Sequence, residues 1–114
     1  MDIRDADLKR KIDELKRSFV EGLGARLSEI EGALERLRQD APLMDQKDIL
    51  RIILEQAHKI AGSAGTFGYG ELGVTASEIE RLCDRILKGK HGADGAAHGD
   101  LSSKIVALRA EAAS

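Results

Sequence analysis

Apolar side chains recur every three or four residues along most of this chain, and that spacing most constrains its fold. Within residues 46–67 five apolar positions lie within roughly 80° of one another on a helix that turns about 100° per residue. They are Ile49, Ile53, Ala57, Ile60 and Ala64. Such a stripe indicates an amphipathic α-helix with one face in a core. The 114 residues contain a single proline, which permits long helices.

Similar stripes occur before and after this one. The first consists of Leu8, Ile12, Leu15 and Phe19, and the second of Leu27, Ile30, Leu34 and Leu37. Gly22 and Gly24 lie between them, and because each weakens a helix interior by about 1 kcal/mol relative to Ala, they predict a break. We therefore expect one helix before residue 22 and a second helix over residues 25–39.

Helix-ending and helix-starting residues place the remaining boundaries. Pro42 ends the second helix, and Asp45 is a plausible N-cap for a helix over residues 46–67. The next helix begins near Gly70, with a stripe made of Leu72, Ala76, Ile79, Leu82 or Cys83, and Ile86.

The last part of the chain is rich in glycine. Residues 89–99 predict a flexible loop, after which Asp100 caps a final helix with Leu101, Ile105 and Leu108 on one face. The pattern thus predicts an all-α fold, an up-and-down four-helix bundle with an additional N-terminal helix, in a single domain over residues 1–114. With each stripe assigned to a core, we expect a monomer.

Composition excludes several classes of function. The net charge is −2 with both signs interspersed, so the chain lacks the basic stripe that nucleic acid requires. It has no apolar run long enough to span a membrane and a charged amino terminus, which favours a cytoplasmic protein without a signal peptide. The single cysteine, Cys83, is expected to be a buried helix residue.

His58 lies opposite the core stripe of residues 46–67. On the helical wheel it falls among Leu54, Glu55, Gly62 and Gly65, and the two glycines leave the surface beside the imidazole without side chains. An exposed imidazole on a rigid helix, with Lys59 beside it to help neutralise an anion, is suited to act as a nucleophile. An ordinary exposed histidine is the simpler alternative, and the glycines argue against it. Since the stretch contains no catalytic motif, the chemistry would come from another protein.

The other two histidines, His91 and His98, fall in the predicted loop. They could in principle bind a metal ion, but there is no third ligand nearby. A solvated loop without a metal is the expected state.

Residues 57–80, "AHKIAGSAGTFGYGELGVTASEIE", resemble the signature of histidine-containing phosphotransfer (HPt) domains. His58 falls on the phosphorylated histidine, Gly62 on the glycine that lets the partner approach, and Gly68 on the closing glycine. Ile60 and Ser63 occupy the hydrophobic and small positions. The lysine that many members carry three residues after the histidine is replaced here by Ala61, and Lys59 stands one residue after it.

The resemblance implies a phosphocarrier in a multistep two-component phosphorelay, without kinase activity of its own. His58 would carry a phosphoryl group between aspartates of receiver domains, which belong to hybrid histidine kinases and response regulators. The carrier needs no cofactor, since the receiver brings Mg²⁺. The expected docking surface consists of Leu54, Glu55, Ala61, Gly62 and Gly65, with Lys59 supporting the phosphoryl group.

Two alternatives remain open. A helical adaptor could bind receiver domains without carrying phosphate, although an intact His58 and Gly62 argue against it. The dimerisation helix pair of a sensor kinase also exposes a histidine, but it needs only two helices and an ATP-binding domain after them.

Overall fold

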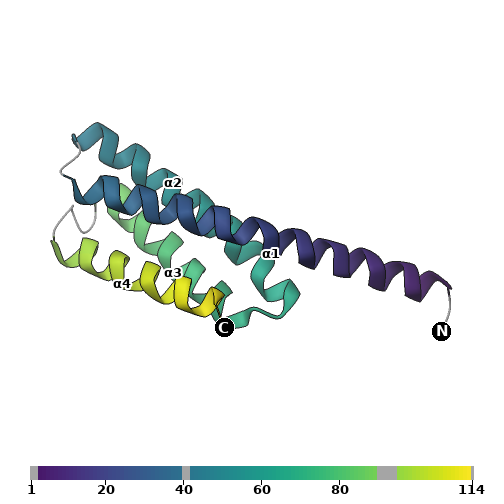
Figure 1. Ribbon diagram of the computed structural model, residues 1–114. Helices are drawn as coiled ribbons and strands as arrows, with labels where there is room; N and C mark the ends of the chain where they lie inside the picture. The colour runs from purple at the N-terminus through teal and green to yellow at the C-terminus, as the bar shows by residue number, and fades with distance from the viewer. Residues whose placement is uncertain (1–2, 40–41, 90–94, 114) are drawn as a thin grey trace.

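Figure 1 shows the computed structural model, which describes residues 3–39, 42–89 and 95–113. These residues form four α-helices and one short 3₁₀ turn. The helices are α1 (Ile3–Arg38), α2 (Leu43–Ala64), α3 (Gly70–Leu87) and α4 (Gly95–Ala112), and the turn η1 (Gly65–Phe67) follows α2. In the described residues, no helix combines the length and the apolar character needed to cross a bilayer.

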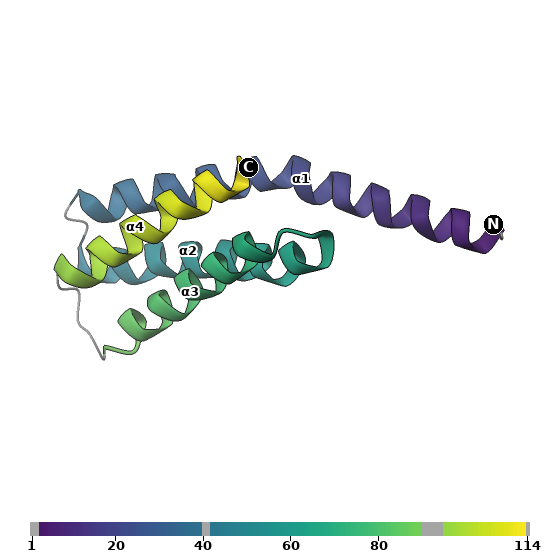
Figure 2. The same cartoon turned by 90° about the horizontal axis from the view of Figure 1, so that it is seen from below.

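The four helices form an up-and-down bundle, as the apolar stripes predict. α1 packs against α2, α2 against α3, α3 against α4, and α4 returns to α1 (Figure 2). The predicted core faces are confirmed from Leu27 onward, whereas Leu8, Ile12 and Leu15 of the first stripe are exposed. Every member of the α2 stripe is at most 1% exposed, and the apolar stripes of residues 72–86 and 101–108 are buried as well. Cys83 is buried as expected, and burial raises the pKa of its thiol to about 12.

The expected additional N-terminal helix is wrong, because α1 runs without a break from Ile3 to Arg38. Gly22 and Gly24 lower helix propensity, yet both lie inside α1. Leu23, between them, is buried in the core, and the Phe19 ring packs 5.6 Å from the Phe67 ring. Packing on this side offsets the cost of the glycines, and the two predicted helices become one.

The predicted N-cap at Asp45 is also wrong. α2 begins at Leu43, with Pro42 at the N-cap position and Asp45 inside the first turn. A proline suits a helix start because its φ angle is already fixed and it has no N–H to satisfy there. At its other end α2 stops at Ala64, three residues earlier than predicted, and η1 follows.

The predicted loop over residues 89–99 is wrong for its last five residues. α4 begins at Gly95, so the stretch up to Gly99 is helical and Asp100 lies inside the helix rather than at its cap. The reason is Ala97, which is buried one turn before Leu101 and extends the apolar stripe of α4 backwards. The rest of the predicted loop, residues 90–94, lies outside the described residues.

Two glycines shape the connection between α2 and α3. Gly68 adopts a φ of +87°, a left-handed conformation that favours glycine, and it ends η1. Gly73 lies where α3 approaches the end of α2, and a Cβ there would be 3.4 Å from the Cβ of Ala64. The short connection and the close approach fix α3 beside the part of α2 that carries His58.

Polar contacts at the edges of the core connect three pairs of neighbouring helices. Arg26 of α1 donates to Gln56 of α2 at 3.0 Å, and Lys104 of α4 contacts Glu78 of α3 at 2.7 Å. Arg109 of α4 pairs with Glu31 of α1, which lowers the pKa of the Glu31 carboxyl. These contacts favour one register of the four helices over others.

Candidate functional site

His58 lies on the outer face of α2, one residue after the fully buried Ala57. Its side chain is 70% exposed, as the helical wheel predicts. The core face on the other side of α2 holds the helix in place, so the imidazole is presented from a rigid backbone.

The imidazole is oriented by a carboxylate from the neighbouring helix. Nδ1 of His58 lies 2.8 Å from Oε1 of Glu80 on α3, whose side chain is 30% exposed. An ionised carboxylate can only accept a hydrogen bond, so Nδ1 is the donor and carries the proton. This tautomer leaves the lone pair of the neutral ring on Nε2.

Sequence reasoning missed Glu80. The sequence does contain one indication of it. Glu80 follows the core residue Ile79 as His58 follows the core residue Ala57, so each side chain lies just outside the core face of its helix. The pairing depends, however, on the relative register of α2 and α3. The periodicity of either helix alone does not contain that register.

Gly62 and Gly65 form an exposed surface beyond His58, which we call the glycine patch. A Cβ built on either glycine would find no atom within 4 Å outside its own helix backbone. Neither has a positive φ, so the internal packing of the bundle does not require glycine at these positions. Because neither glycine has a side chain, nothing projects from these two positions beside the imidazole.

The remaining predicted residues differ in exposure. Lys59 and Glu55 are exposed, on the same side of α2 as His58 or next to it. Leu54 is half-buried and packs against the core, so it is less accessible than a fully exposed docking residue would be. Ala61 is also partly buried against the core. A lysine at position 61 would therefore start from a more enclosed Cα than Lys59 does.

His98 does not join this site, since it belongs to α4. His98 lies near the start of α4, and its Nε2 is buried without a hydrogen-bond partner among the described residues. His91 lies outside the described residues. Within the part of the chain that the structure describes, no three His, Cys, Asp or Glu side chains are grouped so that they could hold a metal ion.

Comparison with known proteins identifies the family. The Hpt domain family matches residues 14–112, which is most of the chain, and the chain belongs to this family. Hpt domains are phosphocarriers with a histidine phosphotransfer role in phosphorelays, they generally interact with receiver domains, and they are not autonomous kinases. No solved structure was found that matches the chain significantly.

Proposed function

We propose that His58 is the phosphoacceptor of this Hpt domain and that it exchanges a phosphoryl group with aspartates of receiver domains through Nε2. Two observations on His58 support the proposal together. Its Nδ1 lies 2.8 Å from Oε1 of Glu80, and its side chain is nevertheless 70% exposed. One ring nitrogen donates its N–H to a carboxylate of the neighbouring helix, and the other is available to a partner.

The transfer is a displacement at phosphorus. The Nε2 lone pair attacks the phosphorus of a receiver aspartyl phosphate, the P–O bond to the aspartate breaks, and the aspartate leaves as a carboxylate. Phosphorylation at Nε2 while Nδ1 keeps its proton makes the ring cationic. In the reverse direction a receiver carboxylate attacks, the P–N bond breaks, and the neutral imidazole is restored.

Glu80 serves as a positioning residue in this scheme. Its carboxylate accepts the Nδ1 proton in a hydrogen bond that becomes charge-assisted when the ring turns cationic. The interaction is therefore stronger in the transition state than in the resting site, which is the condition for accelerating the step. Glu80 does not touch the reacting atoms and acts only through the imidazole.

The receiver supplies the rest of the chemistry. Mg²⁺ and the cationic groups of the receiver neutralise the phosphoryl oxygens, so the carrier has to offer a nucleophile and an open approach. The glycine patch provides that approach, flanked by Glu55 and by the accessible part of Leu54 and Ala61. A docking surface made of these few residues is small, which suits a transient partner.

Lys59 is the residue of this chain best placed to replace the lysine that many family members carry at the position of Ala61. Its Cα points about 100° away from that of His58 on the helix. The long side chain can nevertheless bring its ammonium towards a phosphoryl group on His58. Because the pair would be solvent-exposed, its contribution is limited to roughly 1 kcal/mol.

Transfer from phosphorylated receiver domains tests the proposal. Each receiver domain of the source organism is charged with radioactive acetyl phosphate in Mg²⁺ and mixed with the wild-type chain, with His58→Gln and with His98→Gln. We expect at least one receiver to label wild type and His98→Gln, with a label that acid removes and alkali does not. His58→Gln should fold normally and remain unlabelled, since its side chain contributes little packing. Labelling of His58→Gln would contradict the assignment, and no transfer from any receiver would favour the adaptor.

A further inference from the structure

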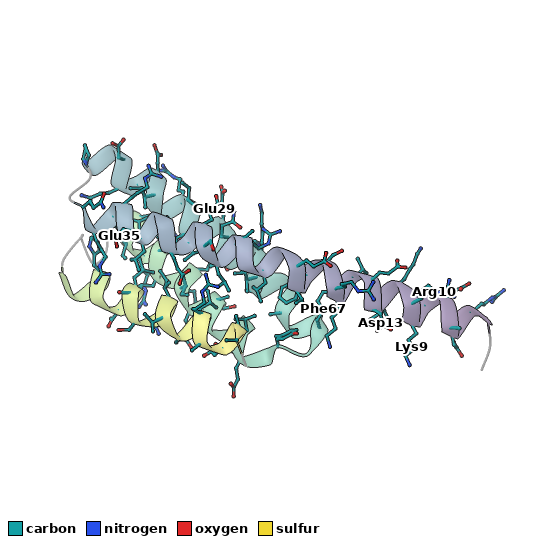
Figure 3. The ribbon with its side chains drawn as sticks, in the orientation of Figure 1. Lys9, Arg10, Asp13, Glu29, Glu35 and Phe67 are labelled. Carbon is teal, nitrogen blue, oxygen red and sulfur yellow. The ribbon has the colours of Figure 1, made fainter. Side chains whose placement is uncertain are left out.

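The amino-terminal part of α1 extends past the bundle. Figures 1 and 2 both show it without a neighbouring helix, and Figure 3 shows Lys9, Arg10 and Asp13 on the part of α1 beyond Phe67. The other helices have 18 to 22 residues, whereas α1 has 36. All side chains from Arg4 to Ser18 are exposed. We call residues 4–18 the N-terminal extension.

The extension carries an apolar stripe that the bundle does not cover. Leu8, Ile12 and Leu15 are 60%, 48% and 59% exposed. The expectation of a monomer assumed that every stripe lies in a core, and for this stripe that assumption is wrong. Phe19 continues the stripe into the bundle, where its ring packs 5.7 Å from that of Tyr69. The exposed stripe is therefore continuous with an existing packing surface.

The spacing of the stripe suits a second helix. The intervals from Leu8 to Ile12, Leu15 and Phe19 are four, three and four residues, the alternation that lets two helices pack along a common seam. A partner helix lying along it would reach the aromatic cluster of Phe19, Phe67 and Tyr69 at one end.

The charged side chains on both borders of the stripe determine which charges a partner helix must carry. Four basic side chains lie within about 100° of the stripe centre on the helical wheel. They are Lys9 and Lys16 on one border and Arg4 and Lys11 on the other. Asp7, Asp13 and Glu14 lie farther round the helix. Asp5 is the acidic residue on the stripe side, and it lies in the first turn, where the helix dipole favours an anion.

These borders disfavour a second copy of the chain. In a parallel pair one border faces the other, and in an antiparallel pair each border faces itself. Both arrangements place basic side chains opposite basic side chains. A membrane surface is also disfavoured, because the N-terminal extension carries six basic and four acidic side chains and so lacks the strong positive charge of membrane-binding helices.

We infer that the N-terminal extension docks an amphipathic helix of another protein, one whose apolar stripe is bordered by Asp and Glu. Such a helix buries Leu8, Ile12 and Leu15 and places carboxylates against both basic borders. With three free apolar layers the contact is short, and we expect weak, transient binding. This surface is separate from His58, so the inference is independent of the proposed phosphoacceptor.

Two designed peptides test the inference. Both are three heptads long with Ile and Leu along the seam, and they differ only in the bordering positions, which are Glu in one and Lys in the other. Each is titrated into the full ¹⁵N-labelled chain to about 1 mM, a range that covers weak contacts of this size. We expect the Glu peptide to shift amide resonances of residues 4–20 and to bind at least tenfold more tightly than the Lys peptide.

Matched variants separate the apolar and electrostatic parts. Ile12→Ser combined with Leu15→Ser should abolish binding while the bundle remains folded, since both side chains are exposed. Lys9→Glu combined with Lys11→Glu leaves one basic and one new acidic side chain on each border and should remove the preference for the Glu peptide. Arg10→Glu combined with Arg17→Glu makes the same change in charge on the opposite side of the helix and should leave the preference for the Glu peptide in place.

Three results would overturn the inference. The first is that neither peptide binds or that both bind equally. The second is dimerisation of the wild-type chain in sedimentation experiments that Ile12→Ser with Leu15→Ser removes, which would assign the stripe to a second copy. The third is binding to anionic phosphatidylglycerol vesicles in place of the Glu peptide, which would assign it to a membrane surface.

Discussion

The two faces of α2 differ sharply although they share one backbone. The core face, with Ile53 and Ala57 at its centre, is at most 1% exposed, whereas His58 on the other face is 70% exposed and lies beside two glycines. The core face contributes stability and has no candidate functional residue. The outer face carries the candidate phosphoacceptor and contributes little to the core. Substitutions on the two faces should therefore have separable effects, one on folding and the other on transfer.

The largest effect is expected on the core face. Ile53→Ala removes a fully buried side chain and should lower the free energy of unfolding by about 2–5 kcal/mol. Denaturant unfolding measures this loss, and Val106→Ala, at a 67% exposed position, is the matched control. The phosphotransfer rate per folded molecule should stay unchanged. A large fall in that rate would show that the two faces are not separable.

A bulky residue in the glycine patch should slow transfer without lowering stability. Gly62→Leu finds open space in the free protein and improves helix propensity by up to about 1 kcal/mol, so stability should not fall. The new side chain obstructs the approach of the receiver, and we expect transfer to slow by more than about tenfold, which corresponds to 1.4 kcal/mol. Gly32→Leu on the outer side of α1 is the control. Unchanged transfer in Gly62→Leu would remove the patch from the docking surface.

Removing the carboxylate beside His58 should slow transfer less. Glu80→Ala loses a hydrogen bond to a ring that becomes cationic, worth roughly 1.5 kcal/mol, or about tenfold in rate. Glu80→Gln still accepts from Nδ1 but lacks the charge, so its rate should lie between wild type and Glu80→Ala. Single-turnover transfer kinetics measure all three. Equal rates for Glu80→Ala and wild type would show that the contact does not contribute.

The smallest effect concerns Lys59. Lys59→Ala should slow transfer by less than about tenfold, because the pairing with a phosphoryl group is exposed to solvent. Adding Ala61→Lys to this variant should restore the rate from the position usual in the family. Rapid-quench measurements with one phosphorylated receiver compare the three proteins. If Lys59→Ala transfers at the wild-type rate, the idea of compensation is wrong.

The sequence predicted the buried faces better than the helix boundaries. The 3.6-residue periodicity placed Ile53 in the core and His58 outside it, because both follow from the geometry of one helix. The helix break predicted at Gly22 and Gly24 was wrong, because tertiary packing of Leu23 and Phe19 outweighs local propensity. The prediction also failed at the start of α4, where Ala97 was not recognised as a core residue.

The candidate site was predicted to the extent that it lies on α2. Glu80 was missed because its contact with His58 depends on how α3 is aligned with α2. The half-burial of Leu54 was missed for the same reason, since neighbouring helices cover part of its side chain. Features that a single helix determines were accessible from the sequence, whereas those that need two helices required the structure.

The central claim is that Nε2 of His58 carries the phosphoryl group while Nδ1 remains bound to Glu80. Long-range ¹H–¹⁵N correlation spectra of the histidine rings, recorded before and after transfer from a phosphorylated receiver, test it most directly. We predict that a single ring changes, that His58→Gln lacks this ring, and that the spectra identify phosphorus on Nε2 with the proton on Nδ1. Phosphorus on Nδ1, or on the ring of another histidine, would contradict the account.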